Sequence, residues 1–216
     1  GVIGFTTPGI MNWDKRYLEG KVYTEGAVES ATKYVPELRA KGADIVVALL
    51  HGGLDSAAYS PTMENPGLHL SKVAGIDAMV MGHQHGVFPD TAATPSFNLP
   101  GVDHKAGTVN GVPAVMASSW GKALGVVQLA LQWDGGKWVV NKTASKSELR
   151  NIQSKNAAGA NVYVEPDATI AALIETQHQA AIKYVKTPIG QTDFRMSTLF
   201  ADVGDPGAIQ IVNQAQ

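Results

Sequence analysis

Three features are scarce or absent in this sequence of 216 residues, and each absence excludes a class of protein. There is no cysteine, so the chain has no disulfide bonds and no thiolate metal ligands. No apolar run approaches the roughly 18 to 20 residues that a membrane-spanning helix needs. Positive charge is not in excess, because the formal net charge is −2 and the lysines are scattered. We therefore expect neither a membrane protein nor a nucleic-acid-binding protein.

The ends of the sequence lack the signals that usually open and close a chain. It begins GVIGFTTPG, with neither a methionine nor a charged and apolar leader. It ends DPGAIQIVNQAQ, which is typical of a helix entered through Pro206 and has no glycine stop. We therefore expect the chain to be a fragment of a longer protein. Its hydrophobic content of 44% is sufficient for a buried core.

Strand and helix patterns alternate through the first 143 residues and predict an α/β fold with an antiparallel hairpin added at its end. An amphipathic helix is expected between Thr24, a candidate N-cap, and Gly42, with a kink or early end at Pro36. A second helix is expected from Asp167, its cap, to about residue 186. The other expected elements are strands at 1–5, 44–50, 77–81 and within 112–121, a short helix at 68–74, a loop at 86–111 and a hairpin at 123–142.

Two of the expected strands run directly into histidine and glycine. Residues 44–50 lead into His51 and two glycines, residues 77–81 lead into a glycine and His83, and His85 follows two positions on. If the two strands are adjacent and parallel, their carboxyl ends meet at one edge of the sheet, where α/β proteins place their ligands. His85 would project to the same side as His83 in an extended segment. Imidazole commonly binds first-row divalent metals, so these histidines are candidate metal ligands.

A simpler interpretation stays open for each histidine. A single histidine at a strand end is more often a packed or solvated side chain than a ligand, and only the three together, beside glycines, favour a metal site. His69 and His178 lie within helical patterns and are expected to be packed or solvated. His104 falls in the long loop, where little favours a functional role.

Three segments together resemble a known family. The segments ADIVVALLHGG, GIDAMVMGHQHG and NGVPAVMASSWGKALGVVQLAL, in this order, are similar to the later half of the metallophosphatase domain of the 5′-nucleotidase family. The resemblance extends over the whole chain. It is strongest to periplasmic members of the family that act on 2′,3′-cyclic nucleotides and 3′-nucleotides.

The resemblance implies a fold and a domain organisation. The fold would be the C-terminal half of a calcineurin-like metallophosphatase αββα sandwich, followed by a linker helix and the start of a second domain. Residues 1–145 would be the later half of the metallophosphatase domain. Residues 146–187 would be a peripheral segment and the interdomain linker helix, and residues 188–216 the start of the C-terminal domain.

The resemblance also implies a chemistry. Two divalent ions, such as Mn²⁺, Zn²⁺ or Co²⁺, would polarise a phosphoryl group and activate a bound water. His51 and His83 would coordinate one ion and His85 the other. The full-length protein would be a hydrolase that converts 2′,3′-cyclic nucleotides and 3′-nucleotides to nucleosides and phosphate in the periplasm. Its partner would be the nucleotide substrate, with no nucleic-acid polymer and no membrane.

The sequence departs from the family pattern upstream of His51. The family's Asp-x-His, Gly-Asp and Gly-Asn-His-Glu motifs supply the other ligands and a histidine that assists the leaving oxygen. None is present, and Asp14 and Asp44 are the only aspartates in residues 1–50. We therefore assign no catalytic residue within the chain, expect it to need the missing N-terminal half of its domain, and expect it to be inactive alone. Two other interpretations stay open: a non-catalytic binding module with structural histidines, and an inactive remnant.

Overall fold

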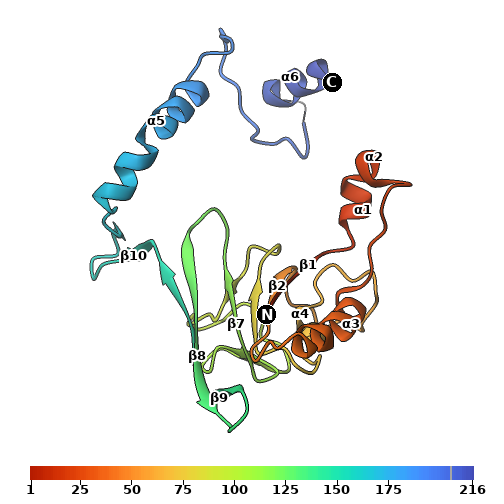
Figure 1. Cartoon of the computed structure of the whole chain (residues 1–216). Coiled ribbons are helices and arrows are strands. Elements are labelled where there is room, and N and C mark those ends of the chain that lie inside the picture. The colour runs from red at the N-terminus through yellow and green to blue at the C-terminus, as the bar shows by residue number, and fades with distance from the viewer. Residues whose placement is uncertain (205) are drawn as a thin grey trace. The chain divides into compact units, whose positions relative to one another are not determined.

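The structure is a computed structural model that describes residues 1–204 and 206–216. These residues form two compact units, residues 1–164 and residues 165–216 (Figure 1). The first unit contains His51, His83 and His85, the histidines predicted to be metal ligands.

Within the described residues, the first unit is built on a seven-stranded sheet in the order β1-β2-β3-β7-β6-β5, with β4 also paired to β7. The first four strands in this order are parallel. They are β1 (Val2–Thr6), β2 (Val47–His51), β3 (Ala78–Met81) and β7 (Val112–Ala117). The antiparallel additions are β4 (Val87–Phe88), β5 (Val102–Asp103) and β6 (Thr108–Val109). The predicted α/β class is confirmed, and the two histidine strands are adjacent and parallel as expected.

The faces of the parallel sheet differ in burial. Side chains alternate across a strand, so Leu50 of β2 and Met81 of β3 are buried in the core, whereas Leu49 and Val80 are 44% and 40% exposed. Helices α3 (Ala27–Ala40) and α4 (Gly67–Leu70) contribute buried side chains to the same hydrophobic core. Two short helices, α1 (Ile10–Trp13) and α2 (Lys15–Leu18), follow β1 and were not predicted.

Helix α3 differs from its prediction at its start and at Pro36. It begins at Ala27, its N-cap is Gly26 instead of Thr24, and no side chain caps it. Pro36 does not end it, because the helix continues to Ala40. Val35 is buried and Leu38 packs against the core, and tertiary packing of this kind stabilises a helix across a poorly bonded turn.

The predicted hairpin is present and longer than expected. Its strands are β8 (Ala123–Trp133) and β9 (Trp138–Asn151). Asp134 closes the turn, since its Oδ1 accepts hydrogen bonds from the backbone N–H groups of Gly136 and Lys137. Gly125 lies against β7, where an added Cβ would be 3.1 Å from Val115. A second, exposed hairpin follows, formed by β10 (Gln153–Lys155) and β11 (Asn161–Tyr163).

The second unit contains α5 (Ala168–Val185) and α6 (Gly207–Ala215). The predicted cap of α5 is confirmed, because Asp167 Oδ1 accepts hydrogen bonds from the N–H groups of Thr169 and Ile170. Pro206 precedes α6, as the sequence predicted. Neither helix has a buried residue, and of the helices that the structure describes none is long and apolar enough to cross a membrane.

Candidate metal centre

His51 and His83 lie side by side at the carboxyl edge of the parallel sheet. His51 is the last residue of β2, and Leu50 is paired with Met81 of β3, so the chain leaving β3 passes next to His51. Nε2 of His51 is 3.3 Å from Nδ1 of His83, and the ring centroids are 5.0 Å apart. Two imidazoles from different strand ends therefore face each other through one nitrogen each.

His85 is placed differently from the sequence-based expectation. The backbone at His83 and His85 has φ values of 67° and 56°, so the segment is left-handed at both residues and the expected extended geometry is wrong. The His85 ring lies against Trp120, with centroids 5.9 Å apart. In the part of the chain that the structure describes, no group of three or more His, Asp or Glu side chains is placed to hold a metal ion. The structure thus shows a histidine pair with His85 beside a tryptophan.

Two residues that were not predicted to belong to the site, Glu64 and Trp13, contact His83. Glu64 Oε1 is 2.5 Å from Nε2 of His83. The indole of Trp13, from α1, stacks on the ring of His83, with centroids 5.3 Å apart and ring planes 29° apart. Gly9 makes room for this indole, because an added Cβ would lie 2.7 Å from it. Both contacts join residues far apart in sequence, so no local motif could have indicated them.

Backbone hydrogen bonds join the loops that carry the pair. The N–H of Gly53 donates to Asn65 Oδ1 at 2.9 Å, and the N–H of Leu54 donates to Gln84 Oε1 at 2.7 Å. The N–H of Gly67 donates to the carbonyl oxygen of Gly53 at 2.8 Å. A Cβ on Gly53 would lie 1.8 Å from Gln84 Oε1, which explains why the second residue after His51 is glycine. The loops after β2 and β3 are therefore held against each other.

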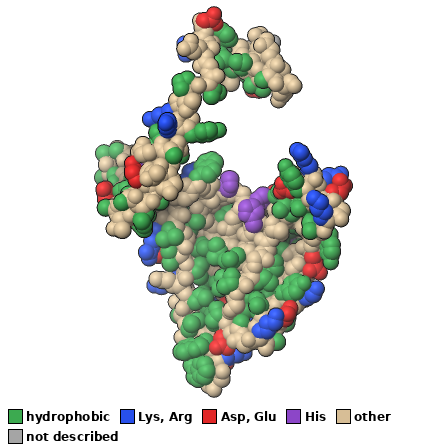
Figure 2. All heavy atoms as spheres, turned by 45° about the horizontal axis from the view of Figure 1, so that its top comes forward, with side chains coloured by type: hydrophobic (Ala, Val, Ile, Leu, Met, Phe, Trp, Pro, Cys, Tyr) green, Lys and Arg blue, Asp and Glu red, His purple; other side chains and the backbone are tan. Residues whose placement is uncertain are grey.

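A shallow hollow on the open face of the sheet reaches His51. Gly4, Leu49, Val80 and Gly82 line it together with His51. Figure 2 shows histidine side chains (purple) at the surface, with hydrophobic side chains (green) spread over the neighbouring face. His51 is exposed and His83 is partly buried, so the pair can be reached from the surface.

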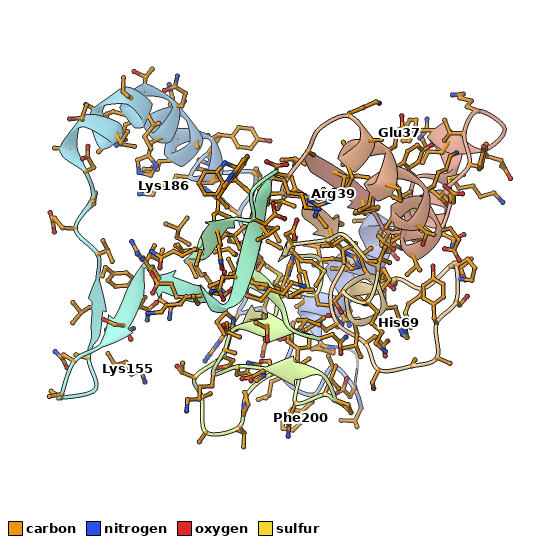
Figure 3. The ribbon with its side chains drawn as sticks, turned by 60° about the horizontal axis from the view of Figure 1, so that its bottom comes forward. Glu37, Arg39, His69, Lys155, Lys186 and Phe200 are labelled. Carbon is orange, nitrogen blue, oxygen red and sulfur yellow. The ribbon has the colours of Figure 1, made fainter. Side chains whose placement is uncertain are left out.

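His69 and His104 each have one hydrogen-bonded ring nitrogen, Nε2 of His104 is buried without a hydrogen-bond partner, and His178 is exposed. His69 Nε2 is 2.9 Å from the carbonyl oxygen of Ala57, and its ring lies 5.3 Å from that of Tyr59 (Figure 3). His104 Nδ1 accepts a hydrogen bond from the N–H of Asp90 at 2.9 Å. His178 is exposed on α5.

The facing nitrogens of the pair fit a divalent ion. Zn–N bonds of about 2.0–2.1 Å in tetrahedral geometry place two ligand nitrogens about 3.3–3.4 Å apart. The observed separation between His51 and His83 is 3.3 Å. Imidazole also suits zinc, manganese and other first-row ions chemically. The pair therefore has the donor chemistry and the spacing of two ligands of one ion.

Comparisons with known proteins agree with the motif segments. No family model matches the chain. It is 43% identical over 216 residues to a 2′,3′-cyclic-nucleotide 2′-phosphodiesterase/3′-nucleotidase of Salmonella typhimurium, and 44% identical over 219 residues to a protein of the same name from Haemophilus influenzae. It is 41% identical over 221 residues to the trifunctional nucleotide phosphoesterase protein YfkN of Bacillus subtilis. Each match includes the whole chain, which spans 32%, 32% and 14% of these relatives.

A solved structure extends the comparison to the fold. The crystal structure of the calcineurin-like phosphoesterase YfkN from Bacillus subtilis matches with a TM-score of 0.73 and 39% sequence identity. The match covers 86% of this chain and 52% of that one. The predicted resemblance is therefore confirmed: along its whole length the chain is similar to one segment of nucleotide phosphoesterases, and over the shared part it has the calcineurin-like phosphoesterase fold, consistent with the later half of that domain.

Proposed function

We propose that this chain forms part of a two-metal phosphoesterase that hydrolyses 2′,3′-cyclic nucleotides and 3′-nucleotides to nucleosides and phosphate. The observation that supports it most is the approach of His51 Nε2 to His83 Nδ1 at 3.3 Å on the carboxyl edge of the sheet. The names of the relatives supply the substrate class. Because the chain spans a third of those relatives, the other ligands and the activity belong to the whole protein.

The chain's own residues have distinct roles in this proposal. His51 and His83 hold one divalent ion and His85 holds the other. Bound divalent ions polarise the phosphoryl oxygens and lower the pKa of a bound water. The Trp13 indole stacked on His83 restricts how that ring can turn, and the Trp120 indole lies beside His85. Residues 1–145, 146–187 and 188–216 serve as the later half of the metallophosphatase domain, the linker and the start of a second domain, and the protein acts in the periplasm.

Phosphate release from a 3′-nucleotide, measured in the whole protein with Mn²⁺ or Zn²⁺, tests this proposal. His83→Ala is expected to lower turnover by orders of magnitude, because a ligand of the ion is lost. His178→Ala is the matched control, since His178 is exposed on α5, and it should keep wild-type turnover. Near-wild-type turnover of His83→Ala at saturating metal would contradict the ligand role.

The same phosphate-release assay distinguishes a phosphoesterase from the alternative, a non-catalytic binding module. Such a module would retain affinity for a nucleotide and release no phosphate. Every relative reported above is named as a phosphoesterase or nucleotidase, so no observation favours this alternative.

A further inference from the structure

The two ring nitrogens of His83 face different partners. Nδ1 faces Nε2 of His51 at 3.3 Å, and Nε2 faces the carboxylate of Glu64 at 2.5 Å. The nitrogens lie on different sides of one imidazole, so a single ion held between His51 and His83 meets Nδ1. Glu64 meets the opposite nitrogen and is therefore not placed as a ligand of that ion.

This arrangement determines which nitrogen carries the proton. An ionised carboxylate only accepts hydrogen bonds, so its partner Nε2 must be the N–H donor. A neutral imidazole has one N–H group, and its other nitrogen then presents a lone pair. Nδ1 is thus left as the acceptor or metal-binding atom of His83. Without Glu64, the hydrogen bond that favours a proton on Nε2 of His83 is lost.

The loop that carries Glu64 is anchored at both of its sides. Next to Glu64, the side chain of Asn65 accepts the hydrogen bond from Gly53 beside His51. Earlier in the loop, the Tyr59 hydroxyl donates to the carboxylate of Glu29 on α3 at 2.5 Å. These bonds place the Glu64 carboxylate relative to the His51 turn, even though its side chain is 52% exposed.

The ring of His83 is also restricted in rotation. Its side chain is only 19% exposed, and the Trp13 indole is stacked on it. A flip of the ring would bring a C–H group instead of a nitrogen toward Glu64 and would lose the bond. The stack and the carboxylate therefore favour one ring orientation as well as one tautomer.

We propose that Glu64 is a positioning residue, which holds His83 as the Nε2–H tautomer and so makes Nδ1 its metal-binding atom. The metal part of this proposal rests on the proposed function, whereas the tautomer is a property of the metal-free chain. Carboxylates commonly orient metal-binding histidines in this way, and loss of such a partner typically lowers metal affinity about 10- to 100-fold.

Nitrogen-15 NMR of the full 216-residue chain, free of metal, reads the tautomer directly. At about pH 8.5, where ordinary imidazoles are neutral, the wild-type chain is expected to show His83 with the proton on Nε2. Glu64→Gln keeps an acceptor oxygen and should retain most of this tautomer, whereas Glu64→Ala should give a mixture. Glu37→Gln changes the same side chain on the exposed surface of α3 and should leave the His83 signals unchanged (Figure 3).

A Zn²⁺ titration of the same substitutions in the whole protein, which supplies the remaining ligands, gives the second measurement. Glu64→Ala is expected to weaken zinc binding at least about 10-fold, with Glu64→Gln in between. A proton on Nδ1 in the wild type, or the same tautomer in wild type and Glu64→Ala, would overturn the role of Glu64. If zinc binding and phosphate release persist in that case, the proposed function stands. If the tautomer is as expected and the whole protein binds no zinc, the metal proposal fails instead.

Discussion

The two edges of the parallel sheet are built in contrasting ways. At the amino edge, Arg39 from α3 donates to the carbonyl oxygens of Asp44 and Gly75 and to the carboxylate of Asp77. Asp77 also accepts from the N–H of Val46 at 2.8 Å. At the carboxyl edge, imidazole nitrogens face each other and the backbone is left-handed at His83.

The contrast indicates different roles for the two edges. At the amino edge, oppositely charged and hydrogen-bonding groups pair, which holds the ends of the strands and α3 together. At the carboxyl edge, two imidazoles are brought together and the backbone at His83 is left-handed, a conformation that clusters at functional sites. Substitutions at the amino edge should therefore change stability, and substitutions of the histidines should change metal binding.

The largest expected loss of stability is at the amino edge. Asp77→Ala removes the partner of Arg39, whose side chain is 28% exposed, and leaves the guanidinium and the Val46 N–H without this acceptor. Loss of one partner of a largely buried pair costs about 3 kcal/mol in free energy of unfolding. Urea unfolding of the chain measures it. Glu37→Gln disrupts only the exposed pair with Lys41 and should cost about 0.5 kcal/mol or less. Equal costs for Asp77→Ala and Glu37→Gln would contradict the stabilising role of the amino edge.

An intermediate loss of stability is expected where Gly53 and Gly67 lie against each other at the carboxyl edge. A Cβ at Gly67 would lie 2.6 Å from the carbonyl oxygen of Gly53, and neither backbone can yield easily. Gly67→Ala is therefore expected to lower the free energy of unfolding by about 1–3 kcal/mol. Gly82→Ala is the control at the same edge, because nothing lies within 4 Å of its added Cβ. A thermal melt in which Gly67→Ala matches Gly82→Ala would contradict the close packing of these loops.

A smaller effect is expected at Tyr59, which ties the Glu64 loop to α3. Tyr59→Phe removes the hydrogen bond to Glu29 and should cost about 1 kcal/mol. Burial and the Glu29 acceptor raise the pKa of Tyr59 from 10.0 to about 12. Because the raised pKa favours the protonated phenol in the folded state, its contribution to stability is present below about pH 10 and is lost as pH rises toward 12. Ultraviolet titration should show one phenolate transition near pH 12 that Tyr59→Phe lacks. If the variant gave the same titration curve as the wild type, the raised pKa of Tyr59 would be contradicted.

The fold could be predicted where the pattern is long or repeated. The apolar runs before His51 and His83 indicated two strands, and their parallel pairing followed from the crossover between them. The strands β4, β5 and β6 lie in the predicted loop 86–111 and were missed, because two residues show no period. Helix α1 was missed for a similar reason, since its four residues include no capping side chain.

The site could be predicted only in part. Glycine beside His51 and His83 indicated close approach of the backbone, and the structure shows that approach between Gly53 and Gln84. The left-handed backbone at His85 was not predictable, because a non-glycine residue rarely adopts positive φ. Glu64 was missed because its partner His83 lies 19 positions away, on another loop.

Zinc binding to the histidine pair tests the central claim most directly. Calorimetric titration of Zn²⁺ into the whole protein is expected to show binding that is weakened or lost in His51→Ala and in His83→Ala and kept in His178→Ala. Without metal, all four proteins should still unfold cooperatively, because neither His51 nor His83 belongs to the hydrophobic core. Zinc affinity unchanged by both His51→Ala and His83→Ala would contradict a metal centre at this edge of the sheet.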